Sequence, residues 1–253
     1  MTHGYRTLQN WNQWLAQQFL GGRLLEAEQQ SLTTALKRHL GKHALLIGVS
    51  HQYPLLESTL IPCHSLVSPL AHREDKFHYR YIEGDFHELP ILAGTIDLVI
   101  LPHTLEWVDN PRQVLMEASR VIKPEGLIAI CGFNPYSIWG LRKRFAKHKR
   151  GPWVGNFLQA QQIKNWLHLA DFEMEEQRTI LFRPPVDQPA LYQKLHFMEQ
   201  IGSRCLPIFG GVYVMLARAK VIPLTPIRLK WKQNLRGIRI STTISGHIAQ
   251  QSK

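Results

Sequence analysis

The sequence predicts an α/β fold built on a largely parallel sheet, and two observations carry this prediction. Short, continuously apolar runs recur along the chain, as expected for strands that are buried on both faces. Segments with helical spacing of apolar residues stand between these runs through most of the chain. Such alternation favours parallel strands joined by helices that cover both faces of the sheet.

The elements are expected in the following order. The first 22 residues place Trp11, Trp14, Leu15 and Phe19 on one helix face, and a second helix spans 24–40, before Gly41. Strands are expected at 43–49, 64–70, 77–85, 96–103, 127–134, 172–183 and 210–220. Helices are expected at 110–122, 136–149, 159–170 and 190–205, with a turn at 123–126. The last strand could insert antiparallel, which periodicity does not decide.

The composition excludes several classes of protein. The chain has 253 residues, of which 44% are hydrophobic and 19% charged, which suits one large globular domain with an appendage. No stretch approaches the roughly 20 apolar residues of a membrane span, and no signal peptide pattern opens the chain. Cys63, Cys131 and Cys205 match no metal-ligand spacing and no disulfide framework. We therefore expect a cytoplasmic protein without a metal site or a transmembrane segment.

The positive charge is concentrated in two places. The net charge is +11, and the segment Arg142–Arg150 holds six Lys or Arg residues and no acid. Residues 200–253 hold nine more, again without an acid, which leaves the rest of the chain mildly acidic. Basic segments of this kind attract nucleic acid or an anionic membrane surface, although a solvated helix face is the simpler explanation for Arg142–Arg150. We expect N-terminal helices at 1–40, a main domain at 41–220 and a basic tail at 221–253.

The residues that follow each strand are the candidates for a ligand site, because ligands of open α/β sheets bind at the carboxyl ends of the strands. These candidates are, in chain order, Gly48, Val49, Ser50 and His51; Ser68 and Pro69; Gly84, Asp85 and Phe86; Pro102, His103 and Thr104; and Gly132, Phe133 and Asn134.

The segment Gly84–Pro135 resembles the central block of class I methyltransferases that use S-adenosylmethionine, and is closest to the type 11 branch. The matching features are Asp85, Leu89-Pro90, Asp97-Leu98-Val99, His103, Asn110-Pro111 and the turn 122–126. The stretch "GFNPYSIWGLRK" is similar to a bacterial branch of that superfamily. The resemblance implies a three-layer, Rossmann-like fold with a seven-stranded, mostly parallel sheet.

The resemblance also implies a cofactor site. Asp85 would accept a hydrogen bond from the adenine amino group and Phe86 would lie near the ring, whereas a simpler role for Asp85 is to cap its turn. The glycine-rich turn of the family is degenerate here, because "IGVSHQYP" keeps only Gly48. Ser68 stands where the family carries an acid for the ribose hydroxyls. The site is therefore either rebuilt with Ser50, Ser68 and backbone groups, with Gly48 and Pro102 also expected among the cofactor contacts, or it is a relic.

His103 is the candidate catalytic residue, because it follows the fourth strand and could act as a general base where the methyl acceptor must lose a proton. A turn residue bonded to the backbone is the alternative. Asp109 or Asn110 is expected to cap the helix at 110–122, and Asn134 or Ser137 is expected to cap the helix that follows the fifth strand.

Two functions remain open. The first is a methyltransferase that uses S-adenosylmethionine and acts on a small or lipid-like acceptor. The second is a catalytically inactive protein of the same fold, which binds nucleic acid or an acidic partner through its basic segments. A nicotinamide-dependent oxidoreductase is disfavoured because the G-x-G-x-x-G motif is absent after the first strand.

Overall fold

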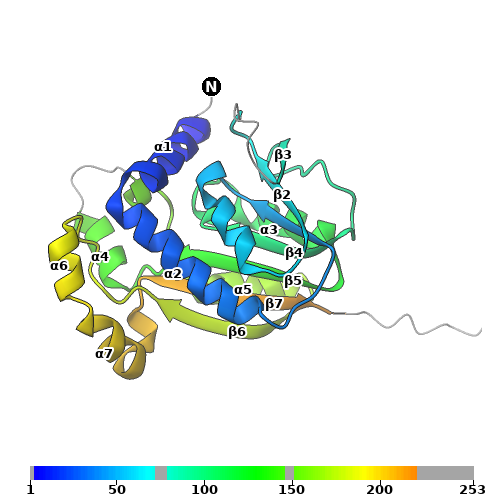
Figure 1. Cartoon of the computed structure of the whole chain (residues 1–253). Coiled ribbons are helices and arrows are strands. Elements are labelled where there is room, and N and C mark those ends of the chain that lie inside the picture. The colour runs from blue at the N-terminus through cyan, green and yellow to red at the C-terminus, as the bar shows by residue number, and fades with distance from the viewer. Residues whose placement is uncertain (1–2, 72–78, 146–150, 221–253) are drawn as a thin grey trace, which may run out of the picture. The chain divides into compact units, whose positions relative to one another are not determined.

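The computed structural model describes residues 3–71, 79–145 and 151–220. Its centre is a seven-stranded sheet with the order β3-β2-β1-β4-β5-β7-β6 (Figure 1). The strands are β1 (His43–Ile47), β2 (Cys63–Ser68), β3 (Arg80–Glu83), β4 (Ile96–Pro102), β5 (Ile122–Phe133), β6 (Phe172–Ile180) and β7 (Val212–Ala219). Strands β1 to β5 pair in parallel, and β7 pairs antiparallel with both β5 and β6. The predicted α/β fold with a mostly parallel seven-stranded sheet is confirmed.

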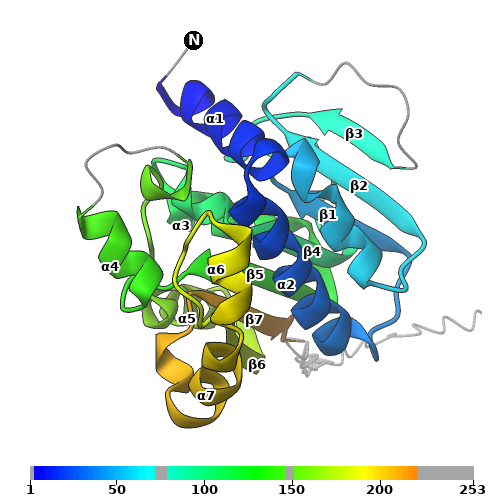
Figure 2. The same cartoon turned by 60° about the vertical axis from the view of Figure 1, so that its left-hand side comes forward.

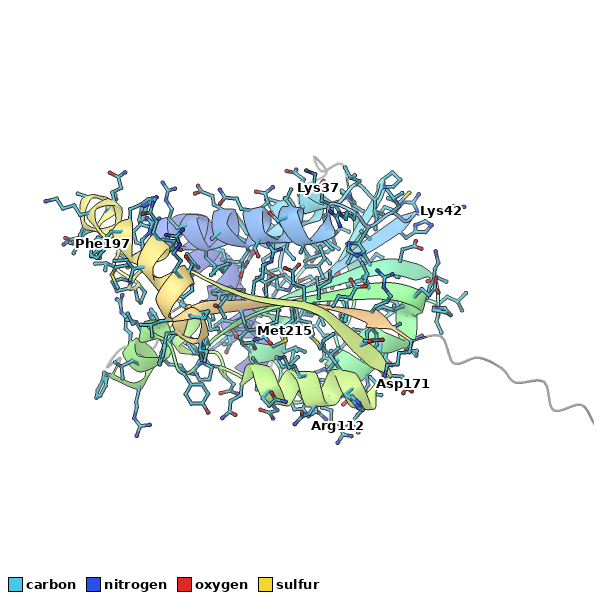
Figure 3. The ribbon with its side chains drawn as sticks, turned by 90° about the horizontal axis from the view of Figure 1, so that it is seen from below. Lys37, Lys42, Arg112, Asp171, Phe197 and Met215 are labelled. Carbon is cyan, nitrogen blue, oxygen red and sulfur yellow. The ribbon has the colours of Figure 1, made fainter. Side chains whose placement is uncertain are left out.

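Helices cover both faces of the sheet. Figure 2 shows α2 lying across one face, and Figure 3 shows α2 and α5 on opposite sides of the strands. The helices are α1 (His3–Gln17), α2 (Phe19–Leu36), α3 (Pro111–Val121), α4 (Ile138–Phe145), α5 (Ala160–Leu169), α6 (Pro189–Lys194) and α7 (Phe197–Cys205). Short 3₁₀ helices are η1 (Ser50–Ser58), η2 (Thr104–Glu106), η3 (Gly151–Trp153) and η4 (Pro207–Phe209).

The core lies between the sheet and these helices. The central strands β1 and β4 are almost wholly buried, as continuous apolar runs in a parallel sheet should be. The described residues belong to one compact unit, and α1 and α2 contribute Trp11, Leu15, Leu24 and Leu32 to the same core as the strands. The expected tail at 221–253 lies outside the described residues. No helix in the described part of the chain is long and apolar enough to cross a membrane.

Several element boundaries differ from the prediction. Helix α2 begins at Phe19 instead of residue 24, because Gln18 is extended and the chain turns there. It ends at Leu36, so Leu40 is exposed and does not belong to the apolar stripe. The single helix expected at 190–205 is two helices, α6 and α7. The expected turn at 123–126 lies within β5, where Glu125 has a positive φ of 63°.

Two predicted helix caps are confirmed. The Asn110 side chain accepts a hydrogen bond from the backbone N–H of Gln113 at 3.2 Å, and Pro111 follows it in the first turn of α3. Ser137 Oγ accepts one from the N–H of Gly140 at 3.2 Å, at the start of α4. Both contacts are local in sequence, which is why the sequence predicts them.

Asp97 joins the ends of three strands. Its Oδ2 accepts hydrogen bonds from the backbone N–H of Lys42 at 3.0 Å and of His43 at 2.9 Å, beside β1. The Lys123 ammonium of β5 donates to both carboxylate oxygens, at 2.8 and 2.9 Å. Burial acts to raise the pKa of Asp97, but Lys123 and the two backbone donors outweigh it, so this pKa is lowered.

We expect Asp97→Asn to lower the free energy of unfolding by about 1–3 kcal/mol near pH 7, because hydrogen bonds to a charged group are lost. A carboxyl group with a lowered pKa stabilises the fold above its unfolded pKa, and this contribution is lost as the pH falls through the folded pKa. The difference between the two proteins should therefore shrink toward pH 3 in urea denaturation. The exposed Asp187→Asn is the matched control, and an equal loss at both pH values would contradict this role of Asp97.

Candidate functional site

The carboxyl ends of the parallel strands lie at one edge of the sheet, which brings the predicted residues to that edge. Gly48 follows β1, Ser68 ends β2, Asp85 comes shortly after β3, and His103 follows β4. Their surroundings differ strongly, so each is described in turn.

The turn after β1 is filled by a side chain of its own. Gln52 is buried, and its Oε1 accepts a hydrogen bond from the backbone N–H of Val49 at 3.0 Å. Its Nε2 donates to the carbonyl oxygen of Pro102 at 2.8 Å, which ties the ends of β1 and β4 together. A Cβ atom on Gly48 would collide with Gln52 Oε1, so the space that this glycine leaves is taken by Gln52. The sequence analysis did not identify Gln52.

Helix α1 lies over the same turn. The Asn12 side chain hydrogen-bonds Ser50 Oγ at 3.2 Å, and Asn12 Oδ1 accepts a hydrogen bond from the backbone N–H of His51 at 3.1 Å. The 3₁₀ helix η1 therefore begins against α1. Ser50 was predicted as a cofactor contact, and in this arrangement its hydroxyl is engaged by Asn12.

An aromatic cluster fixes α1 in this position. Trp11 is buried and stacks on Trp107, with ring centroids 5.0 Å apart, and on Trp14 at 5.3 Å. It also meets the rings of His103 and Phe133 edge-on, at 5.5 and 6.1 Å. Stacked and edge-on aromatic pairs each contribute about 0.5–1.5 kcal/mol beyond their buried area.

His103 forms a buried charge cluster with two carboxylates. Its Nε2 lies 2.5 Å from Glu28 Oε1 of α2, and its Nδ1 lies 3.1 Å from Glu106 Oε2 of η2. Burial acts to lower the pKa of His103, but Glu28 and Glu106 together raise it to about 10. Glu106 in turn accepts a hydrogen bond from the backbone N–H of Phe133, while burial raises the pKa of Glu106.

This arrangement limits the chemistry of His103. A protonated imidazole donates from both ring nitrogens, so it has no lone pair with which to accept a proton. The catalytic role of His103 stays a prediction, and the described arrangement favours a structural role. Neither carboxylate partner was identified from the sequence. A signal was present for Glu28, which stands in helical register with the buried Leu24 and Leu32.

A cavity of about 450 Å³, here called the edge cavity, opens beside this cluster. Its lining residues are Thr7, Leu8, Pro69, Asp85, Phe86, His87, Glu106, Trp107, Val108, Asp109, Val154, Gly155 and Asn156. The cavity therefore combines one wall from α1 with the turns that follow β2, β3 and β4.

Asp85 and Phe86, which the sequence analysis gives as two expected cofactor contacts, both line the edge cavity. Asp85 Oδ1 accepts a hydrogen bond from the N–H of His87 at 2.8 Å and lies 2.9 Å from His87 Nδ1. These contacts lower the pKa of Asp85, so the carboxylate is ionised at neutral pH. Both contacts use Oδ1, which leaves Oδ2 as an acceptor, and 69% of the side chain is exposed.

Ser68 lies outside the edge cavity. It is fully buried at the end of β2, and its Oγ accepts only a long hydrogen bond of 3.4 Å, from the N–H of Leu70, among the contacts of the described residues. The structure thus brings Asp85 and Phe86 together and places Gly48 and Pro102 against Gln52. It engages Ser50 with Asn12 on the turn that also holds Gln52, and Ser68 lies outside the edge cavity.

The chain resembles known methyltransferases in both sequence and structure. Residues 63–130 match a family model described as a methyltransferase domain. The solved structure of an S-adenosylmethionine-dependent methyltransferase from Thermotoga maritima superposes with a TM-score of 0.56 at 18% identity, covering 83% of this chain and all of that one. A second such enzyme, from Mesorhizobium loti, superposes with a TM-score of 0.53 at 12% identity, over 77% of this chain and 99% of that one. This chain therefore has the fold of class I methyltransferases.

Relatives with curated names match only part of the chain. The protein YafS of Escherichia coli is 30% identical over 159 residues, which is 62% of each chain. Malonyl-[acyl-carrier protein] O-methyltransferase of Laribacter hongkongensis is 29% identical over 101 residues, which is 39% of this chain and 34% of that one. The chain therefore spans less than two thirds of the length of these relatives. The [4+2]-cyclase SpnF superposes with a TM-score of 0.52 at 18% identity, over 76% of this chain and 80% of that one, so this fold also carries other chemistry.

We expect His103→Asn to lower the free energy of unfolding by about 3–5 kcal/mol at pH 8, because two buried carboxylates then face each other without a cation. Asparagine tolerates the left-handed backbone at this position, where φ is 58°, so the change tests the charge rather than the turn. In the unsubstituted chain, a raised histidine pKa stabilises the fold fully below pH 6.5, and this contribution is lost as the pH rises toward 10.

The measurement is urea denaturation followed by tryptophan fluorescence. The double variant Glu28→Gln, His103→Asn should recover much of the loss, because one of the two carboxylates is then neutral. A double variant that is less stable than His103→Asn alone would argue against an ionic cluster.

Proposed function

We propose that this protein is a methyltransferase that uses S-adenosylmethionine and acts on a small or lipid-like acceptor. The edge cavity carries the proposal, because it places an ionised carboxylate and an aromatic ring at the carboxyl ends of the strands in a class I methyltransferase fold. The cofactor supplies an activated methyl group, so the protein's task is to position the acceptor and exclude water.

Asp85 and Phe86 fit the adenine end of this cofactor. Asp85 Oδ2 is an acceptor suited to an exocyclic amino group, and the lowered pKa keeps it ionised at neutral pH. Phe86 lines the same cavity and offers an aromatic surface, although only 3% of it is exposed.

The methionine end of S-adenosylmethionine does not fit at the turn after β1 in the described arrangement. Gln52 fills the turn at Gly48, and Asn12 engages Ser50 above it. The edge cavity and the turn at Gly48 are here together called the crevice. Binding of the whole cofactor in the crevice therefore requires Gln52 to change its rotamer and α1 to move away from η1.

The acceptor class is inferred from the relatives. A set of partial relatives carries the name malonyl-[acyl-carrier protein] O-methyltransferase, which describes transfer of a methyl group to an acyl-carrier-linked substrate. This agrees with a small or lipid-like acceptor rather than a nucleic acid.

We expect Asp85→Ala to weaken binding of S-adenosylhomocysteine about tenfold or more, because a charge-assisted hydrogen bond to the adenine amino group is lost. Calorimetric titration near physiological salt measures this. Asp187→Asn, far along the chain in an exposed loop, is the control and should bind as the unsubstituted protein does. Equal affinity of the Asp85 variant would remove this carboxylate from the site.

The turn after β1, which Gln52 fills, favours a second candidate function. In this candidate, the chain is a catalytically inactive protein of the same fold that binds nucleic acid, an anionic membrane surface or an acidic partner. Its expected contact surface is Arg142–Arg150 together with the tail, of which the structure describes only 142–145. Within that part, Arg142 lies over the Trp153 ring at 5.0 Å and Lys143 over the Phe157 ring at 4.4 Å. Two of the basic side chains thus pack on the protein's own aromatic rings.

A variant that weakens the contact between α1 and η1 distinguishes the two candidate functions. If the protein is a methyltransferase, Asn12→Ala should strengthen S-adenosylhomocysteine binding several-fold, because the apparent affinity scales with the fraction of molecules whose crevice is open. Asn10→Ala, on the exposed side of the same helix, is the matched control and should leave the affinity unchanged. Calorimetry measures both variants, and circular dichroism checks that they fold. An absence of binding in the unsubstituted chain and in Asn12→Ala would favour the inactive protein.

A further inference from the structure

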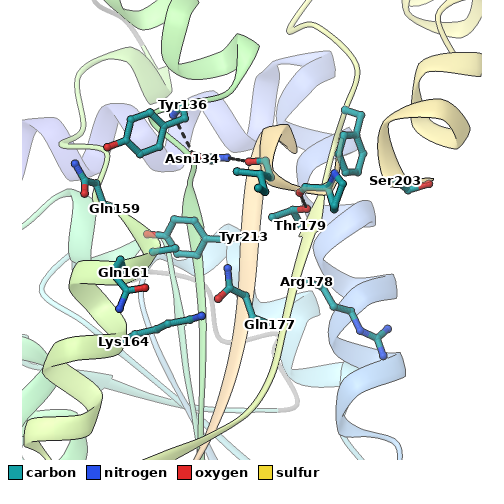
Figure 4. Close-up of a pocket in the computed structure, with 14 residues that line it drawn as sticks. Asn134, Tyr136, Gln159, Gln161, Lys164, Gln177, Arg178, Thr179, Ser203 and Tyr213 are labelled. Carbon is teal, nitrogen blue, oxygen red and sulfur yellow. Dashed lines mark hydrogen bonds between the residues drawn. The ribbon is translucent and has the colours of Figure 1, made fainter. Parts of the chain in front are cut away.

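A second cavity, here called the hairpin groove, lies between α5 and the β6–β7 hairpin. It has a volume of about 580 Å³ and shares no lining residue with the edge cavity. Figure 4 shows the side chains that line it, which come from α5, from β6 and β7, and from α7 and η4. Its lining residues are Asn134, Tyr136, Gln159, Ala160, Gln161, Lys164, Gln177, Arg178, Thr179, Phe182, Ser203, Pro207, Ile208 and Tyr213.

Tyr213 places a buried hydroxyl without a partner at this groove. Only 1% of the residue is exposed, and its hydroxyl has no hydrogen-bonding partner among the described residues. The backbone partner of Tyr213 on β5 is Gly132, where a Cβ would collide with this hydroxyl. The glycine thus makes room for a polar group whose burial without a partner destabilises the fold. Burial raises the pKa of Tyr213 well above its usual value, so the hydroxyl keeps its proton and remains a donor.

The amino end of α5 faces the same groove. Gln159 is the N-cap residue, yet its side chain makes no capping hydrogen bond, and Ala160 and Gln161 line the groove. The first N–H groups of a helix have no partner within the helix, and together with the helix dipole they favour an anion. This is independent of the Tyr213 hydroxyl, which belongs to another element.

Lys164 adds a positive charge about one turn further along α5. In Figure 4 its ammonium group points into the groove, toward Gln177 and beneath Tyr213. The structure gives Lys164 no hydrogen-bonding or ion-pair partner among the residues that it describes. Arg178 also lines the groove, but its guanidinium pairs with Glu176 and points away from Tyr213. Among the residues that the structure describes, no Asp or Glu lines the groove, so the charge of Lys164 is not neutralised there.

An apolar wall completes the groove. Phe182 and Pro207 line it, together with Ile208, which is 72% exposed. Small-molecule sites commonly combine apolar side chains with a few placed polar groups, which suits a ligand that has an apolar body and a polar head.

We infer that the hairpin groove binds a small organic anion, whose carboxylate or phosphate group lies against Tyr213, Lys164 and the amino end of α5, and whose apolar body lies on Phe182 and Ile208. The inference concerns binding and stands apart from the proposed methyl transfer, because its test uses no methyl donor.

The test is a titration of the full chain with three probes of similar size: phenylbutyrate, phenyl phosphate and the neutral phenylbutanol. At least one anion should bind in a saturable manner, and about tenfold or more tightly than the alcohol, because a charged partner is gained. Backbone amide signals of Ala160, Gln161 and Thr179 should shift on binding in NMR spectra. Equal binding of the alcohol, or no saturable binding of either anion at millimolar concentration, would overturn the inference.

Two variants locate the contacts. Lys164→Gln should weaken binding of the preferred anion about tenfold, whereas Lys37→Gln, at the far end of α2, should leave it unchanged. Tyr213→Phe should weaken anion binding and yet raise the midpoint of urea denaturation, because an unsatisfied buried hydroxyl is removed without a change of shape. A Tyr213→Phe variant that is less stable than the unsubstituted chain, with unchanged anion affinity, would contradict the assignment.

Discussion

A protonated histidine between two buried carboxylates is the interaction on which the carboxyl edge of this sheet depends. His103 follows β4, Glu28 comes from the middle of α2, and Glu106 belongs to η2. Glu106 also accepts the N–H of Phe133 at the end of β5. One cation thus joins a helix to the ends of two neighbouring strands. Because charges are costly to remove from water, the members stabilise the fold only as a complete set.

The same cluster determines how the crevice is closed. Helix α1 leads into α2 through the extended Gln18, so anchoring α2 at Glu28 restricts where α1 can lie. Trp11 then rests against the ring of His103, and the turn after β1 is covered. The edge of the sheet and its cover are therefore coupled through one side chain. Movement of α1 must separate Trp11 from this ring but need not disturb the charges beneath it.

Much of the fold could be predicted from the sequence, because the determining signals are local. Apolar runs marked the strands, and Asn110 and Ser137 marked helix starts within three residues of their bonding partners. The edge cavity was partly predictable, since Asp85 and Phe86 are adjacent in the chain and follow one strand.

The rest of the site depends on contacts between distant segments, which periodicity does not encode. Glu28 lies 75 residues from His103, and its position among leucines was the one available signal. Gln52 bonds a carbonyl oxygen 50 residues away. Tyr213 looks like an ordinary strand residue until its pairing with Gly132 is known. The positions of strand ends thus identified candidate residues, while their partners came only from the tertiary structure.

The strand order has a consequence for synthesis on the ribosome. Strand β7 lies between β5 and β6, so the last strand of the described chain must enter between two strands made before it. Until residue 219 has emerged, β5 exposes an edge of buried apolar residues and β6 has no neighbour in the sheet. An unpaired edge of this kind invites pairing with another chain. The nascent protein should therefore need protection at β5 for longer than at any strand from β1 to β4, whose partners are synthesised earlier.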